Sequence, residues 1–213
     1  MTGFRTWEDY FIPDTTVLRN KFTTVACPLG EEDPAKLEQL ESAVTALRLS
    51  QLAARPINGQ FDYDHMKAIH RYVFQDVYEW AGQERTAPAG FMNKAGHLYY
   101  AAGPALTAAA EAEYAKLARA NLLRGLEHEE FVVALAESWG ELNVIHSFRE
   151  GNTRTQFVFF AQLADQAGYR IDTAQLAPGT ALRDEFVQAR FHSQDYGDNG
   201  PLADVLRRGV VPR

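Results

Sequence analysis

The chain has 213 residues, of which 46% are hydrophobic and 23% charged, so it is long enough to bury a sizeable core without disulfides or metals. Its 21 basic and 28 acidic residues give a formal net charge of −7, which argues against a general nucleic-acid binder. A single cysteine, Cys27, excludes an internal disulfide or a cysteine-rich zinc site. The longest apolar runs, such as residues 157–161, are too short to span a membrane, and the first residues lack a signal-peptide pattern. We therefore expect a cytoplasmic protein.

Residues 1–33 contain aromatic residues and prolines but little periodicity, and we interpret them as an irregular arm that packs on the body of the protein. Residues 34–213 show helical patterns and are interpreted as one domain. Its first helix is predicted to begin at Asp33 and Pro34, because aspartate is a favoured helix cap and proline a favoured first residue. Apolar residues three and four positions apart give this helix one buried face: Leu37, Leu40, Val44 and Leu47.

A second helix is predicted from Asp62, which can cap it, to Ala81 and Gly82, which end it. Its expected buried face consists of Ile69, Tyr72, Val73, Val77 and Trp80. Residues 83–102 interrupt the helical pattern with a proline and two glycines, and their Leu-Tyr-Tyr run is typical of a short strand. We expect a β-hairpin, or flap, in this segment.

The rest of the chain is again helical in pattern. The expected helices are residues 104 to about 123, 127–145, 152–167, 181–192 and a short last one from residue 201. Glycine, proline or a capping residue marks most of their ends. The predicted fold class is therefore all-α, a helical bundle with one short hairpin flap.

One connector between two of these helices holds residues suited to chemistry. Residues 146–154 read His-Ser-Phe-Arg-Glu-Gly-Asn-Thr-Arg. Gly151 allows the backbone to turn with positive φ, and the first amides of the following helix have no partner within that helix. Such a turn is a preformed anion site. Arg154 places a cation against the helix dipole, which a bound polyphosphate between the two would explain.

Two side chains of this connector complete a candidate site. Glu150 would repel a phosphate unless a metal lay between them, so it is the candidate ligand for Mg²⁺. His146 has an ordinary pKa near ~6.5 and can accept a proton from an incoming hydroxyl. Each residue also has a plain interpretation: a capping histidine, a solvated carboxylate and, for Arg154, a surface arginine. The other histidines are interpreted as surface or satisfied core residues: His65, His70, His97, His128 and His192.

Together with Phe148 and Asn152, the connector resembles the core motif of the Fic family, in the Fic/Doc superfamily. The family pattern is His-x-Phe-x-(Asp/Glu)-Gly-Asn-Gly-Arg-x-x-Arg. The segments 80–85 and 141–145 also look like parts of this family. The resemblance implies a protein adenylyltransferase that moves AMP from ATP to a Tyr, Thr or Ser hydroxyl of a target protein.

By position in the motif, the resemblance implies a role for each residue. His146 would be the base, Glu150 would hold Mg²⁺ between the α- and β-phosphates, and Arg154 would contact the outer phosphates. The anion hole would be lined by Gly151, Asn152 and Thr153. The flap, about Thr86 to Tyr99, would bind the target segment by strand addition.

The chain departs from the motif at two positions, where Thr153 replaces the second glycine and Phe157 the second arginine. Losing that arginine removes a charge-assisted contact worth roughly 1.5–3 kcal/mol. Two alternatives follow: a degenerate Fic domain that serves as a nucleotide-binding or interaction module, and a transferase that uses another nucleotide donor. The family's inhibitory helix, (Ser/Thr)-x-x-x-Glu-(Gly/Asn), has only an imperfect match at residues 107–112. The resemblance then implies a toxin-like regulator with a separate, antitoxin-like inhibitor.

Overall fold

The computed structural model describes residues 4–94 and 96–213. Its α-helices are α1 (Pro34–Ala54), α2 (Tyr63–Phe74), α3 (Pro104–Arg119), α4 (His128–Ile145), α5 (Asn152–Gln166), α6 (Ala181–Tyr196) and α7 (Gly200–Gly209). Single-turn 3-10 helices, η1 and η2, cover Glu8–Tyr10 and Asn121–Leu123. Two antiparallel pairs join β1 (Phe91–Lys94) to β2 (His97–Ala101) and β3 (Tyr169–Ile171) to β4 (Val210–Pro212). The predicted mostly helical fold with a hairpin flap is confirmed.

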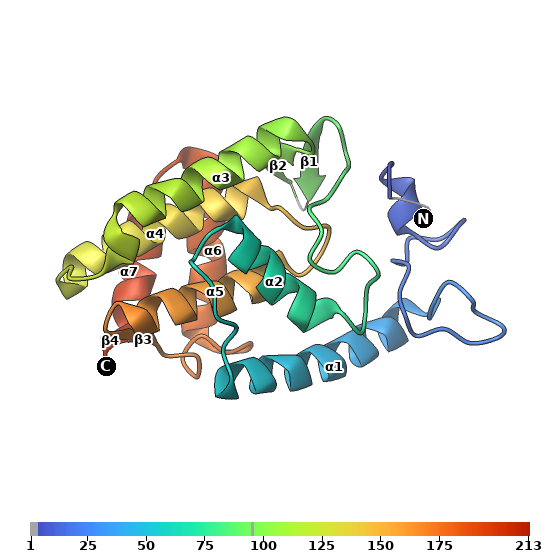
Figure 1. Ribbon diagram of the computed structural model, residues 1–213, viewed down its shortest axis with the longest axis horizontal. Coiled ribbons are helices and arrows are strands. Elements are labelled where there is room, and N and C mark those ends of the chain that lie inside the picture. The colour runs from blue at the N-terminus through green and yellow to red at the C-terminus, as the bar shows by residue number, and fades with distance from the viewer. Residues whose placement is uncertain (1–3, 95) are drawn as a thin grey trace.

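The helices form a bundle in which α3 and α4 lie along one side, α1 along the other, and α2 and α5 between them (Figure 1). Helix α4 is its central element, because it packs against α3, α5, α6 and α7. The predicted inward residues Phe131, Leu135 and Trp139 are completely buried. The Trp139 ring stacks on Phe160 of α5, with 4.5 Å between ring centroids. This rigid core holds the C-terminus of α4, where the connector begins.

Two helices end earlier than the sequence pattern predicts. Helix α2 stops at Phe74 rather than at residue 81, because the chain makes a tight turn in which the Val77 N–H donates to the Phe74 carbonyl at 2.9 Å. Val77 and Trp80 are nonetheless buried, so their apolar spacing reflects a buried loop and not a helix face. Helix α3 stops at Arg119 because residues 121–123 adopt positive φ.

The buried face of α1 also differs from the prediction. Leu47 is 60% exposed, whereas Thr45 is buried together with Leu37 and Leu52. The face that packs therefore carries polar groups, and it does so because it meets a charged residue of the connector, described below. The β3–β4 pair was not predicted at all, since its three-residue strands are too short to show an alternating pattern.

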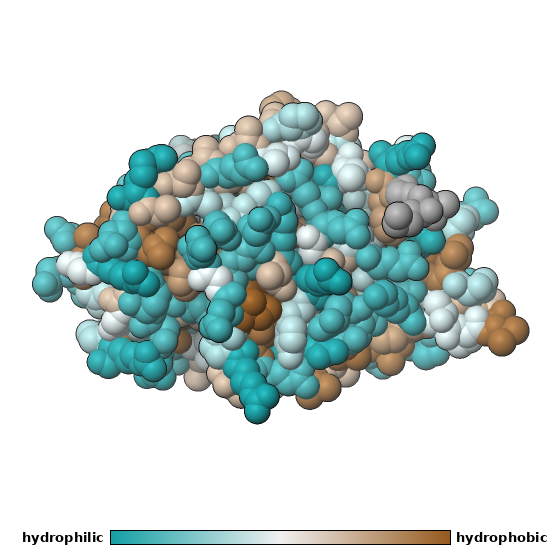
Figure 2. Space-filling model, viewed as in Figure 1, coloured by the Kyte–Doolittle hydropathy of each residue, from teal (hydrophilic) through white to brown (hydrophobic). Residues whose placement is uncertain are grey.

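Residues 4–33 pack against the segment that follows α2. The Tyr10 ring meets Trp80 edge-on, with centroids 5.8 Å apart, and the Lys21 N–H donates to the Val77 carbonyl at 2.8 Å. The domain division at residue 33 stays a prediction. On the face seen in Figure 1, hydrophilic residues cover most of the surface and hydrophobic ones form small, separate patches (Figure 2). No helix in the described part of the chain is long and apolar enough to cross a membrane.

Candidate active site

The connector starts at His146, which ends α4 with a left-handed backbone, φ 50°. A buried arginine from the segment before the flap fixes this turn: Arg85 Nε donates to the His146 carbonyl at 2.8 Å. The Arg85 N–H also donates to the Ser147 carbonyl at 2.9 Å. Burial lowers the pKa of Arg85 to about 10, so it stays charged at neutral pH. Sequence reasoning placed Arg85 in a family-like segment but did not give it this role.

Asn152 closes the connector on itself. Its side-chain oxygen accepts from the Phe148 N–H at 2.9 Å, and its side-chain nitrogen donates to the Phe148 carbonyl at 2.7 Å. Phe148 is buried, as expected of an anchor. These two bonds hold the Asn152 side chain against Phe148, and its backbone N–H remains available to line the predicted anion hole.

His70 of α2 contacts the connector through a hydrogen bond and a ring stack. Its Nδ1 accepts from the Gly82 N–H at 2.7 Å, so its Nε2 carries the proton and donates to the Glu150 carbonyl at 3.0 Å. Its ring also stacks on Phe148, with centroids 3.9 Å apart. Burial lowers the pKa of His70 to about 3, which keeps the ring neutral. Of the two interpretations offered for this histidine, the satisfied core residue is confirmed.

Gly151 provides the turn that opens α5, with φ +81°. The first helical bond runs from the Thr155 N–H to the Gly151 carbonyl at 3.1 Å. No hydrogen bond from the backbone N–H groups of residues 152–154 is present among the described residues. Free amides at a helix N-terminus can bind an anion, and their role as the anion hole stays a prediction.

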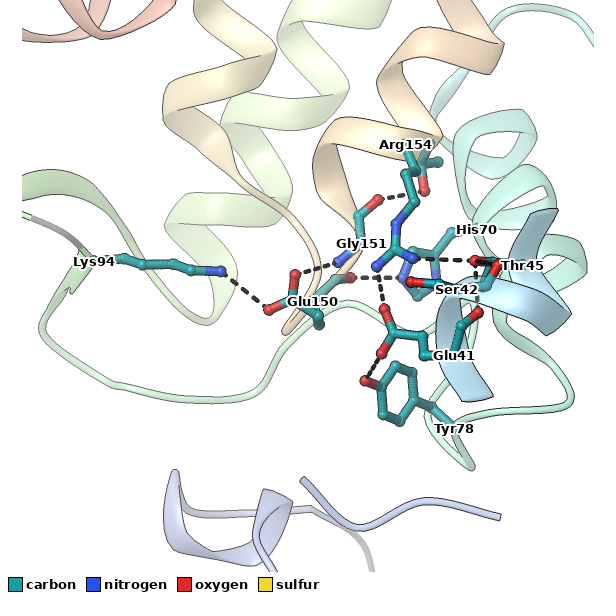
Figure 3. Close-up of polar contacts among 10 residues, drawn as sticks. Glu41, Ser42, Thr45, His70, Tyr78, Lys94, Glu150, Gly151 and Arg154 are labelled. Carbon is teal, nitrogen blue, oxygen red and sulfur yellow. Dashed lines mark hydrogen bonds and ion pairs between the residues drawn. The ribbon is translucent and has the colours of Figure 1, made fainter. Parts of the chain in front are cut away.

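Glu150 faces the flap. Lys94 of β1 reaches across to it, with 3.0 Å between Nζ and Oε2, and the Gly151 N–H donates to its other oxygen at 3.1 Å (Figure 3). Burial opposes ionisation of Glu150, but the Lys94 ammonium and the Gly151 N–H more than offset it, so the pKa of this carboxyl lies below its usual value. Glu150 is therefore an anion, and among the described residues it forms an ion pair with one cation, Lys94 of the flap.

Arg154 points to α1. Its guanidinium pairs with the Glu41 carboxylate and donates to the Thr45 hydroxyl at 3.1 Å, and the Tyr78 hydroxyl also donates to Glu41 (Figure 3). The polar face of α1 is thus explained by this arginine. From the sequence, we expect a bound polyphosphate to balance the charge of Arg154 at this helix N-terminus. In the structure, the Glu41 carboxylate balances that charge. A contact between Arg154 and phosphates stays a prediction.

His146 is nearly buried, with 7% of its surface exposed and its ring 4.2 Å from that of Tyr99 on the flap. Burial, together with the Lys94 charge, lowers the pKa of His146 to about 3, so the ring is neutral at pH 7. Its Nδ1 lies 3.3 Å from the Asn143 carbonyl and must be the protonated nitrogen if it donates there. The lone pair is then on Nε2, which is the form that can accept a proton.

Each of the two residues that depart from the motif contacts one arginine of α6. The Thr153 hydroxyl accepts from Arg190 Nη1 at 2.9 Å. Phe157 meets Trp139 edge-on at 4.9 Å, and the Arg183 guanidinium lies 4.7 Å above its ring. These contacts could not be predicted from the sequence, because α6 shows only an ordinary helical pattern.

The two buried histidines predict that the protein loses stability in acid. His70 and His146 each have a pKa near 3 in the folded state, against 6.5 ordinarily. The unfolded chain therefore binds more protons between pH 6.5 and 3, and the free energy of unfolding falls as the pH falls, by about 1.4 kcal/mol per pH unit for each histidine. Urea denaturation at several pH values from 7 to 5 measures this slope. The His70→Gln variant should have a shallower slope, and an equal slope would contradict the prediction.

Known proteins are similar to this chain over most of its length. The sequence model of the Fic/DOC family matches residues 60–164. The protein adenylyltransferase VbhT of Bartonella schoenbuchensis is 37% identical over 96% of this chain, which spans 39% of the length of VbhT. The probable protein adenylyltransferase y4lH of Sinorhizobium fredii is 36% identical over 93% of each chain.

A solved structure is also similar over nearly the whole chain. It is the N-terminal Fic domain of a VirB-translocated effector protein from Bartonella quintana with bound ADP, which superposes with a TM-score of 0.85 and 27% identity over 97% of this chain and 96% of that one. The connector, the flap and these relatives together define the class, and this chain belongs to the Fic/DOC family.

Proposed function

We propose that this chain transfers AMP from ATP to a Tyr, Thr or Ser hydroxyl of a target protein. The observation that carries the proposal is that one turn brings together a neutral His146, the ionised Glu150 and the free amides of residues 152–154. His146 Nε2 would take the proton of the hydroxyl as its oxygen bonds to the α-phosphorus. The bond between the α- and β-phosphates then breaks, and pyrophosphate leaves. The adenylyltransferase names of the relatives and the ADP bound to the structural neighbour support this reaction.

Positioning and charge neutralisation supply most of the catalysis in phosphoryl-group chemistry. The free amides of residues 152–154, Thr153 among them, would hold phosphate oxygens, and Arg154 would approach the outer phosphates from the α1 side. Glu150 would hold Mg²⁺, which when bound neutralises phosphate charge. The described residues contain no cluster of three or more metal-ligating side chains, and this fits a metal held by one carboxylate and the substrate's phosphates. Lys94 would have to release Glu150 first.

The flap is the proposed binding site for the target protein. In the described part of the chain, β1 and β2 form a two-stranded sheet, and the outer edge of β1 can accept another strand. The Leu98 and Tyr100 carbonyls of β2 already accept from Gln194 and Arg85. Phe91 and Leu98 of the flap are 73% and 57% exposed. Strand addition along this edge would bring a target hydroxyl beside Tyr99 and His146, whose rings are in contact.

A separate inhibitor is the second part of the regulator hypothesis. A largely apolar groove of about 1090 Å³ lies between α1, α5 and the segment before α6, and Thr153, Arg154 and Phe157 line one wall of it. A small antitoxin-like protein seated there would reach the phosphate-binding half of the motif. We keep a toxin-like role and a cytoplasmic location as predictions.

The test of the proposed function is label transfer from nucleotides to protein in a bacterial extract, with Mg²⁺ held constant. Label from α-³²P-ATP on a protein supports AMP transfer, and label from γ-³²P-ATP alone would mean phosphorylation. A panel of other labelled nucleotides tests whether the protein uses a different donor. This test is needed because Phe157 replaces the second arginine of the motif. Nucleotide binding without transfer from any donor would contradict the proposal and favour the binding-module alternative.

A further inference from the structure

Arg190 of α6 is a buried cation with few partners. Its residue surface is 7% exposed, its Nη1 donates to the Thr153 hydroxyl at 2.9 Å, and its Nε has no partner. A guanidinium has five N–H donors, and this single bond is the one hydrogen bond of the Arg190 side chain to the described residues. Burying a charge without a counter-charge is strongly unfavourable, so a purely structural role leaves Arg190 unexplained.

The neighbours of Arg190 do not balance its charge. The rings of Phe186 and Phe191 lie 5.6 and 5.9 Å from the guanidinium. Burial, helped by the nearby Arg183 charge, lowers the pKa of Arg190 to about 10, which still leaves it protonated at neutral pH. Within the described residues, Arg190 forms no ion pair with a carboxylate.

Arg190 also lies beside the turn that would hold phosphates. Thr153, its partner, is the second residue of α5 and belongs to the amides that lack acceptors. The charge of Arg190 is felt at the His146 ring, where it adds to the lowering of the pKa of that ring. Phe157 is one helical turn after Thr153 on the same face of α5, so a side chain that reaches Thr153 from α6 approaches the place where the motif arginine would be.

Three other cations around this turn are already occupied, whereas Arg183 of α6 lies above the Phe157 ring and forms no ion pair with a described residue. Arg154 is paired with Glu41, Lys94 with Glu150, and Arg85 donates to main-chain carbonyls. Of Arg154, Lys94, Arg85 and Arg190, Arg190 is the one that combines a single side-chain hydrogen bond with no ion pair to described residues.

We propose that Arg190 binds the phosphates of the nucleotide, supplying from α6 the positive charge that α5 lacks at Phe157. This inference rests on the proposed function, since it deepens the assignment of the same site. In this variant of the motif, the positive charge for phosphate binding comes from α6 and not from α5. The Thr153 hydroxyl then has a role too, because it orients the guanidinium toward the amide turn.

The test compares nucleotides that differ only in phosphate number. Titration calorimetry with ATP, ADP, AMP and adenosine is run on the full chain without a target protein. Arg190→Gln keeps a hydrogen-bond donor for Thr153 but removes the charge. We expect it to lower the affinity for ATP and for ADP by about 10- to 100-fold. Adenosine affinity should change less than twofold. The control is Arg208→Gln, an exposed arginine of α7 paired with Glu185, which should leave all four affinities unchanged.

Rescue and stability controls keep this test decisive. Adding Phe157→Arg to Arg190→Gln should restore most of the ATP affinity, because the charge returns from the other helix. The ratio of ATP to adenosine affinity is the readout, since partial unfolding would lower both alike. If Arg190→Gln does not fold, Arg190→Lys replaces it, and its ratio should fall several-fold because an ammonium cannot bind phosphates in the bidentate manner of a guanidinium.

The outcomes separate this inference from the transferase proposal. An ATP-to-adenosine ratio that these variants leave unchanged would overturn the role of Arg190 and leave AMP transfer standing. A ratio that falls as expected, in a protein that transfers no label, would support Arg190 and contradict the transferase. Wild-type protein that binds ATP no more tightly than adenosine would overturn both.

Discussion

Replacing His146 with alanine should lower the rate of AMP transfer by about 10²- to 10⁴-fold, the usual contribution of a general base. The imidazole is neutral, and with Nδ1 donating to the Asn143 carbonyl its lone pair is on Nε2, beside the flap that would present the target hydroxyl. The initial rate of label transfer from α-³²P-ATP measures the effect. Among the described residues, the His146 side chain makes one long hydrogen bond, of 3.3 Å, and a ring contact with Tyr99, so the fold should survive the change.

The control for His146→Ala is His192→Ala, which removes a partly exposed histidine of α6 that pairs with Asp198. That variant should transfer AMP at the wild-type rate. Nucleotide affinity of His146→Ala should also match the wild type, since the amide turn and Arg85 are untouched. A His146→Ala protein that binds ATP normally and keeps more than a tenth of the transfer rate would contradict the role of His146 as base.

The same assay also reports the protonation of His146 through its pH dependence. The value of kcat/KM follows the free enzyme, in which the pKa of His146 is about 3. An unshifted imidazole would be only about one-tenth neutral at pH 5.5, so the rate would fall roughly tenfold from its value at neutral pH. We expect instead that kcat/KM at pH 5.5 stays within about twofold of that value, as long as the protein is folded.

The fold and the centre of the site could be predicted because their signals are local. Asp33 and Asp62 do cap α1 and α2, and the glycines and proline of residues 83–102 do mark the hairpin. The connector is equally local, since nine consecutive residues carry both its turn and its chemistry. Neighbouring residues are enough to recognise features of this kind.

What the sequence could not show depends on pairs that are distant along the chain. Glu41 and Arg154 are 113 positions apart, Arg85 and His146 are 61 apart, and Thr153 and Arg190 are 37 apart. A buried polar contact leaves no periodic pattern in the sequence. For this reason the predicted buried face of α1 included Leu47, whereas in the structure Thr45 is buried and Leu47 is exposed. The charges that tune the site thus become visible only once the helices are packed.

Replacing Gly151 with alanine should destabilise the protein by about 2–4 kcal/mol, because two penalties add. Its φ of +81° is unfavourable for a residue with a Cβ, and that Cβ would lie 2.2 Å from the Phe74 ring. Phe74 is completely buried, so it has little room to move. Equilibrium denaturation in urea measures the loss. Nucleotide affinity of the folded fraction should fall as well, since any shift of residue 151 moves the free amides.

Gly168 provides the matched control at the other end of α5. Its φ is +92°, but a Cβ there would have no neighbour within 4 Å. Gly168→Ala should therefore cost only the backbone penalty, about 1 kcal/mol. The difference between the two variants isolates the contact with Phe74, which together with His70 holds the amide turn against α2. Equal losses in the two variants would mean that Phe74 moves aside freely and that the turn is not rigidly held.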